Sequence, residues 1–241
     1  MRPEPVSVGY EVLFMHLPRK YDKLTLKEFE IELTKSALAS DYARSQLQGS
    51  EASGYELLLE GGGMGAESAM RVGLDGIRIF ERQTGITVER FIHKVREILE
   101  LAFKRLEMRF LFGQVTTVRS LFEPTAYEDS RDFLATGLCS LKGKLMEHFK
   151  SAPPVGVGLT LHFIPRGEAG VEYRVALSPV YNDIKRLLAE CTNTFDPSMQ
   201  KVQITSANLD LVERKIRQTY DFLNTDVLAF LDKYDKKETP K

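Results

Sequence analysis

The stretch Gly9-Tyr10-Glu11-Val12-Leu13-Phe14-Met15-His16-Leu17-Pro18 decides the fold, because its outline returns as Gly113-Gln114-Val115-Thr116-Thr117-Val118-Arg119-Ser120-Leu121-Phe122-Glu123-Pro124. Each stretch has a leading glycine, the residues of a strand and a closing proline. After each one the sequence predicts a helix, a β-hairpin region and a long amphipathic helix. The order of elements repeats, whereas the amino-acid identities do not, so an internal duplication is a hypothesis.

We therefore expect an α+β protein of two tandem β-α-β-β-β-α modules. The rules for packing layers predict two antiparallel sheets, each backed by a long amphipathic helix. The first module is expected over residues 1–108 and the second over 109–235. Residues 236–241 are charged and end near a proline, which predicts a disordered tail.

The first half contains one ambiguous segment. Its expected elements are a strand at 8–16, a helix within 25–45, a polar loop at 48–54, strands at 55–60, 68–73 and 76–81, and a helix from Thr87 to about Met108. Thr25 with Glu28 three residues later resembles a capping box, which favours the helix within 25–45. Residues 29–33 alternate between apolar and polar, so a strand there is the alternative.

The second half follows the same order. Its expected elements are a strand at 110–119, a helix at about 130–150, a strand at 155–164, a hairpin loop at 166–170 and a return strand at 171–179. Residues 183–195 fit a helix or a strand, and the parallel with the first half favours a strand. The chain ends in an amphipathic helix of about 27 residues, roughly 40 Å long. Its apolar stripe is Leu209, Val212, Ile216, Tyr220, Leu223, Val227, Phe230 and Tyr234.

Composition narrows the class of protein. The chain has 241 residues, 43% of them hydrophobic and 28% charged, as in ordinary globular proteins. The formal net charge of −1 argues against a strongly nucleic-acid-binding surface, although a local patch stays open. No apolar run is long enough for a signal peptide or a membrane span. Cys139 and Cys191 do not form a disulfide framework, which predicts a reducing cytoplasm.

Gly61, Gly62, Gly63 and Gly65 lie directly after a predicted strand, where phosphate-binding loops occur. The lysine and the Ser or Thr of a P-loop are absent, because Ala66-Glu67-Ser68 follows. The favoured interpretation is a hairpin loop in which the glycines supply positive φ. A ligand-contacting loop is the alternative.

No recognisable catalytic or metal-binding motif is present, so no metal and no cofactor are predicted and an enzyme is disfavoured. If an unrecognised active site exists, its candidates are the acids Glu128, Asp129 and Asp132, or the pair His16 and His162. The acids also suit the first turn of a helix, where negative charge is stabilised, and this interpretation is favoured. Cys139 and Cys191 are expected to be buried small apolar residues.

The order of elements resembles a sporadically distributed bacterial family of uncharacterised proteins of about 250 residues. The resemblance rests on three segments, which are the Pro-led strand at 5–14, the Arg-led strand at 109–115 and the phenylalanine-containing helix at 220–224. It spans most of the chain and implies no known activity.

The sequence favours a non-enzymatic binding or scaffolding protein with a protein partner or a second copy of itself. The expected surfaces are the groove between the modules and the last helix, where Tyr220, Val227, Phe230 and Tyr234 would contact the partner. A helix this long exceeds what a small sheet needs for cover. The alternatives are a small-molecule or lipid-binding protein with a cavity between sheet and helix, and a nucleic-acid-binding accessory protein.

Overall fold

The computed structural model describes residues 6–141 and 156–236. In its first half the strands are β1 (Val6–Met15), β2 (Arg44–Ser50), β3 (Gly54–Gly61), β4 (Glu67–Val72) and β5 (Gly76–Arg82), with helices α1 (Lys23–Thr34) and α2 (Val88–Arg105) and the 3-10 turn η1 (Ala39–Asp41). In the second half the strands are β6 (Gly113–Phe122), β7 (Leu159–Phe163), β8 (Val171–Val180) and β9 (Asp183–Phe195). Its helical elements are α3 (Ser130–Asp132), η2 (Phe133–Leu138), η3 (Pro197–Gln200), α5 (Asp210–Asp221), η4 (Phe222–Val227) and α6 (Leu228–Tyr234).

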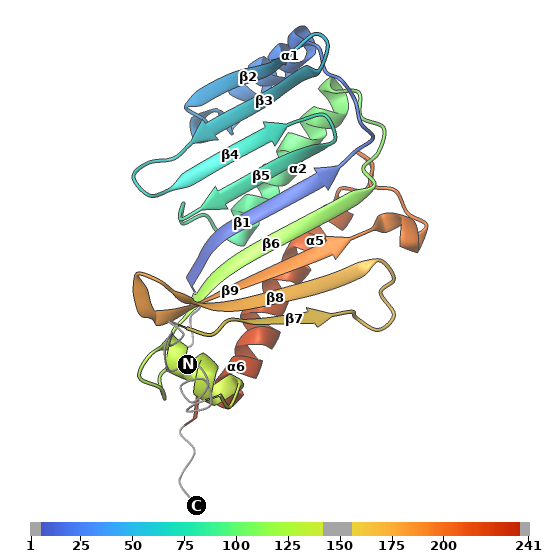
Figure 1. The fold of residues 1–241 in the computed structure, drawn as a ribbon. Coiled ribbons are helices and arrows are strands. Elements are labelled where there is room, and N and C mark those ends of the chain that lie inside the picture. Colours follow the sequence, from blue (N-terminus) through green and yellow to red (C-terminus); the bar gives the residue numbers. More distant parts are fainter. Residues whose placement is uncertain (1–5, 142–155, 237–241) are drawn as a thin grey trace, which may run out of the picture.

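The strands form one antiparallel sheet of nine strands in the order β2-β3-β4-β5-β1-β6-β9-β8-β7 (Figure 1). β1 and β6 pair directly at its centre, with Val12 opposite Thr116. The expectation of two separate sheets is therefore wrong. The leading strands of the two halves complete each other's hydrogen bonds, and neither presents an exposed edge.

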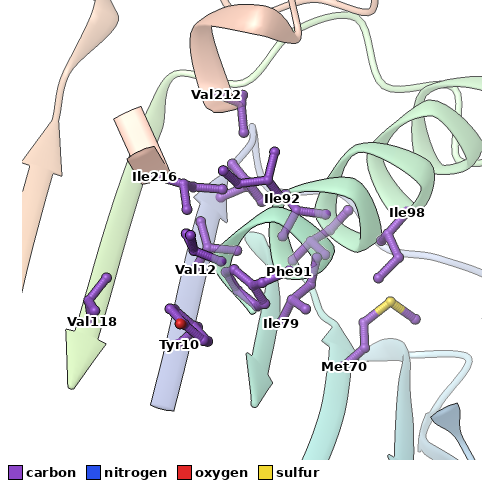
Figure 2. Packing of buried hydrophobic residues seen from close by; sticks show 14 of the residues in the cluster. Tyr10, Val12, Met70, Ile79, Phe91, Ile92, Ile98, Val118, Val212 and Ile216 are labelled. Carbon is purple, nitrogen blue, oxygen red and sulfur yellow. The ribbon is translucent and has the colours of Figure 1, made fainter. Parts of the chain in front are cut away.

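The helices α1, α2, α5 and α6 lie on one side of this sheet (Figure 1). Alternation along β1 produces the layer beneath them, since Tyr10, Val12 and Phe14 are almost fully buried on that side. Phe91 of α2 stacks on the Tyr10 ring with centroids 5.2 Å apart, and Ile216 of α5 lies over the same layer (Figure 2). A single core cluster thus includes residues from both halves of the chain.

The helix expected within 25–45 is confirmed as α1, and the alternative strand at 29–33 is not formed. The helix ends at Thr34, and its N-cap is Asp22, whose carboxylate accepts from the Thr25 N–H, so the expected cap at Thr25 is wrong. After it, the Ser36 hydroxyl donates to the Leu33 carbonyl, a local bond that competes with helix continuation. β2 occupies part of the expected polar loop and makes this half β-α-β-β-β-β-α.

The second half matches its predicted order, and residues 183–195 are the strand β9. The strand expected at 110–119 begins and ends three residues later, as β6. The helix expected at 130–150 begins at Ser130 and continues as the π-helical turn η2, while residues 142–150 lie outside the described part. The last helix runs from Asp210 to Tyr234 as predicted, with a π-helical segment, η4, in its middle.

The boundary expected between residues 108 and 109 falls in the segment that joins α2 to β6. The expected tail lies, apart from residue 236, outside the described residues. No described helix combines the length and apolar character that crossing a membrane requires.

Replacing Phe14 by Ala tests which side of the sheet is covered. Phe14 is fully buried under the helices, so its truncation is expected to lower the free energy of unfolding by about 3–5 kcal/mol. Leu13→Ala, the neighbouring position on the opposite side, is the control and is expected to cost about 1 kcal/mol. Urea unfolding followed by circular dichroism measures both, and equal losses would contradict the one-sided core.

Candidate functional site

The side of the sheet opposite the helices, called here the open face, is uncovered by any helix of the described residues (Figure 1). Because side chains alternate between the two faces of each strand, every second residue of a strand lies on the open face. On β1 it carries Glu11 and Leu13, and on β5 it carries Arg78 and Phe80, all of them exposed or half-buried. A surface of this extent is available for contact with another molecule.

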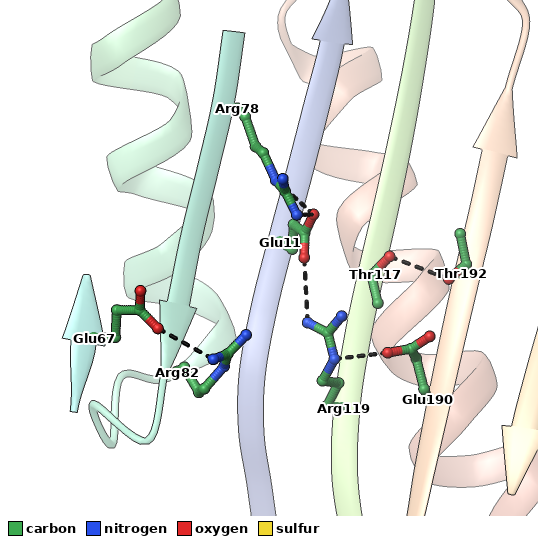
Figure 3. A network of polar contacts seen from close by, with 8 residues as sticks. All are labelled: Glu11, Glu67, Arg78, Arg82, Thr117, Arg119, Glu190 and Thr192. Atoms are coloured by element: carbon green, nitrogen blue, oxygen red, sulfur yellow. Dashed lines mark hydrogen bonds and ion pairs between the residues drawn. The ribbon is translucent and has the colours of Figure 1, made fainter. Parts of the chain in front are cut away.

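Ion pairs connect four neighbouring strands across the open face (Figure 3). Arg78 of β5 donates from Nε to Glu11 Oε1 at 2.8 Å. Arg119 of β6 donates to Glu11 Oε2 at 3.3 Å and, from Nε, to Glu190 Oε2 of β9 at 2.7 Å. Glu11 and Arg119 are each shared by two partners, so the charges form a continuous ladder across the centre of the sheet.

The same pattern extends outward from this ladder. Other pairs on the open face are Arg82–Glu67 at 3.2 Å, Arg71–Glu56 with Nε at 3.0 Å, and His162–Glu172 at 3.2 Å. These arginines each face a glutamate, so the open face carries little net charge. Exposed pairs of this kind add little stability, and their arrangement bears mainly on recognition.

A second feature is a surface hollow of about 410 Å³ where η1, β5 and the start of α2 meet. Its lining includes Asp41, Ser68, Glu81 and Arg90. Ser68 and Glu81 are 5% and 3% exposed, so polar groups of the hollow are built into the protein interior.

Lys94 of α2 lies behind this hollow and is 2% exposed. Its Nζ donates to Glu81 Oε1 at 2.6 Å and to Ser68 Oγ at 2.9 Å, and lies 3.0 Å from Asp41 Oδ2. It also lies 4.4 Å from the centroid of the Tyr42 ring, a cation–π contact. All three ammonium protons thus have carboxylate or hydroxyl partners, as a buried charge requires.

Along 87–108 the Lys and Arg residues are interleaved with Glu, a pattern typical of a solvated helix face, so the sequence does not predict this cluster. Lys94 lies three residues after Phe91 and four before Ile98, on the buried stripe of the helix. That spacing was the available signal. The partners of Lys94 were not predictable, since they come from three separate segments.

A comparable buried lysine occurs in the second half. Lys215 of α5 is 4% exposed and donates to Glu168 Oε2 at 2.9 Å. Its Nζ lies 5.0 Å from the centroid of the Phe195 ring. In both halves, therefore, the long helix anchors a lysine between a carboxylate and an aromatic ring.

The glycine cluster forms the connection between β3 and β4, as expected for a hairpin loop. Gly62 and Gly65 have φ of +111° and +78°, values that favour glycine. Gly62 also lines the hollow, while Gly63 has open space where a side chain would be. Gly61 packs tightly, since an added Cβ would lie 1.8 Å from the Asp41 carbonyl oxygen.

The structure does not bring the candidate histidines together. His16 is buried at the end of β1 and contacts the Leu17 carbonyl and the Tyr21 hydroxyl. His162 lies on β7, which three strands separate from β1 in the sheet order, and is exposed. The histidine pair therefore forms no joint site.

The acidic cluster caps a helix, which confirms the favoured interpretation. Asp129 is the N-cap of α3 and accepts from the N–H groups of Arg131 and Asp132. Burial raises the pKa of Asp129, but these bonds and the Arg131 guanidinium outweigh it and hold the pKa below its usual range. Asp132 accepts from the Thr136 hydroxyl, and Glu128 is exposed.

The two cysteines differ in burial. Cys191 is buried in β9, and burial raises the pKa of its thiol to about 12. Cys139 is half-buried, so the expectation that both are buried holds only for Cys191. Among the residues that the structure describes, no three His, Cys, Asp or Glu side chains group as metal ligands would.

The apolar residues expected to meet a partner on the last helix largely cover the protein's own sheet. Val227 is 6% exposed, and Tyr220 is half-buried with its ring 6.4 Å from that of Tyr10. The rings of Phe230 and Tyr234 pack together with their centroids 5.2 Å apart, and Tyr234 is the most exposed of the four residues.

Comparison with known protein families and with curated proteins adds no assignment. No family model matches the chain, and no curated protein matches it. The resemblance to an uncharacterised bacterial family stays an expectation.

Removing the Lys94 ammonium leaves Glu81 and Asp41 without their shared cation. Lys94→Met is therefore expected to lower the free energy of unfolding by about 3–5 kcal/mol. Lys104→Met, on the exposed side of the same helix, is the control and is expected to be near neutral. In the double variant Lys94→Met/Glu81→Gln, chemical denaturation should show a smaller loss than the single variants would give by addition. Strict additivity would contradict the coupling.

The glycine loop offers a second matched pair. Gly61→Ala forces its Cβ onto the Asp41 carbonyl and is expected to cost about 1–3 kcal/mol of stability. Gly63→Ala meets no atom within 4 Å and should change stability by less than about 0.5 kcal/mol. Thermal unfolding of both variants measures the difference, and a stable Gly61→Ala protein would show that the packing of this loop is not needed.

Proposed function

We propose that this chain is a non-enzymatic binding protein that holds a partner protein against the open face of its sheet. The observation that carries the proposal is a nine-stranded sheet with its helices on one side and an ordered ladder of ion pairs on the other. A sheet face of this size without cover is a natural contact surface.

The balance of charge favours a protein over a nucleic acid. Phosphate backbones are bound by surfaces with a surplus of Lys and Arg. On the open face the arginines of the ladder each have a glutamate within ion-pair distance, as for Arg78 with Glu11 and Arg119 with Glu190. Half-buried apolar side chains such as Leu13, Phe80 and Val115 lie between these charges. Apolar contacts framed by satisfied polar groups are typical of protein interfaces.

The open face is favoured over the two surfaces expected from the sequence. β1 and β6 are joined by backbone hydrogen bonds, so the sheet has no groove between the halves. In the helix layer, Arg96 of α2 bridges to Asp210 and Glu213 of α5 at 2.9 and 2.6 Å. The last helix packs most of its stripe on its own sheet, with Tyr234 the exception.

We also infer that the two halves are tandem modules of common origin. In each half the first strand pairs with the last strand of the same half, β1 with β5 and β6 with β9. The remaining strands follow outward in reverse chain order on both sides. The buried lysines Lys94 and Lys215 on the two long helices support the same inference.

Site-specific photocrosslinking in the native cell tests the docking face. A photoreactive amino acid at Thr192, a half-buried position on β9 next to the ladder, is expected to capture a discrete partner (Figure 3). The same amino acid at Arg214, an exposed position on α5, is the control and should capture none.

Charge reversal makes the test specific. Arg119→Glu in the Thr192-labelled protein should abolish the crosslink, because Glu11 and Glu190 would then repel the new carboxylate. Crosslinks from Arg214 but not from Thr192, or a crosslink that survives the reversal, would count against the open face.

A further inference from the structure

The hollow beside η1 lies apart from the open face and has the character of a small-molecule site. Its volume of about 410 Å³ falls within the range of ligand pockets. Its walls come from the turn after β5, the loop at Gly62 and the first turn of α2. Thr84, Gly85 and Thr87 contribute hydroxyl and backbone groups to the wall next to that helix.

One carboxylate of the hollow is only half satisfied. Glu81 Oε1 accepts from Lys94 Nζ at 2.6 Å and from Ser68 Oγ at 2.8 Å. Glu81 Oε2 accepts no hydrogen bond from the described residues, although the residue is 3% exposed and lines the hollow. Oε2 is not one of the fully enclosed side-chain atoms that lack a partner, so it reaches the solvent of the hollow. It is therefore an acceptor that a ligand bound in the hollow can reach.

The charges around that oxygen favour a ligand group that donates hydrogen bonds and carries a positive charge. Lys94 is a single cation between two carboxylates, Glu81 and Asp41, which leaves a net negative charge at the floor. At the rim, Arg90 Nη2 lies 3.8 Å from Asp41 Oδ1, too far for a hydrogen bond, and its side chain is 71% exposed. The hollow thus has a negative floor and a cationic rim.

We propose that this hollow binds a free α-amino acid. Its ammonium group donates to Glu81 Oε2 and faces the Asp41 carboxylate, and its carboxylate pairs with the Arg90 guanidinium. Guanidinium and carboxylate match in shape and charge, which sets the orientation. A phosphate ligand would be repelled by the two acids. A divalent cation would lack ligands, since no cluster of three metal-ligating side chains occurs among the described residues.

Isothermal titration calorimetry of the purified full chain with each of the twenty common L-amino acids tests the proposal. At least one is expected to bind. For the tightest binder, the N-acetyl derivative lacks the ammonium and the methyl ester lacks the carboxylate, and each should bind about tenfold more weakly or worse. Absence of binding by all twenty, or an N-acetyl derivative that binds equally well, would overturn the proposal.

Two variants test which residue of the protein binds each end of the amino acid. Arg90→Gln alters an exposed side chain, so the protein stays folded. It should weaken amino acid binding about tenfold while leaving methyl ester binding unchanged. Glu81→Gln should weaken the amino acid and spare its N-acetyl derivative. Arg71→Gln, on the open face, is the matched control and should bind as the parent does. If Arg90→Gln binds the amino acid as tightly as Arg71→Gln, the site is wrong, whatever the fate of Glu81→Gln.

Discussion

The antiparallel pairing of β1 with β6 is the constraint on which the rest of the structure depends. Nine residue pairs from Val6–Leu121 to Met15–Gly113 fix the register, with an irregularity between Ser7 and Gly9. A slip of one residue would turn Tyr10, Val12 and Phe14 away from the helices. The same register places Glu11 and Arg119 together on the opposite side. One pairing therefore determines both the core and the open face.

Ion pairs in the helix layer also connect the two halves, on the other side of the sheet. Arg96 on α2 pairs with Asp210 and Glu213 on α5, and Arg217 on α5 pairs with Glu89 on α2. These exposed pairs add little energy singly, but they span the two halves of the chain. The halves consequently share a sheet and a core, and their surfaces are fixed relative to each other.

The sequence revealed those features that repeat along the chain. Alternation on β1, β8 and β9 and the helical spacing from Leu209 to Tyr234 depend on neighbours close in sequence. β2 was not predicted because an edge strand has little to bury. Of its residues only Leu47 is even half-buried. The Lys94 cluster was not predicted because its partners Asp41, Ser68 and Glu81 come together only after the sheet has formed. That no helix of the described residues covers the open face is likewise a property of the whole fold.

Hydrogen exchange of the backbone amides, followed by NMR, tests the central role of the β1–β6 pairing most directly. If that pairing joins the halves into one cooperative unit, the hydrogen-bonded amides of β1 and β6 exchange only through global unfolding and are among the slowest in the chain. Fast exchange at the β1–β6 seam, with the strands on either side still protected, would contradict the account. It would show two independent halves that merely touch.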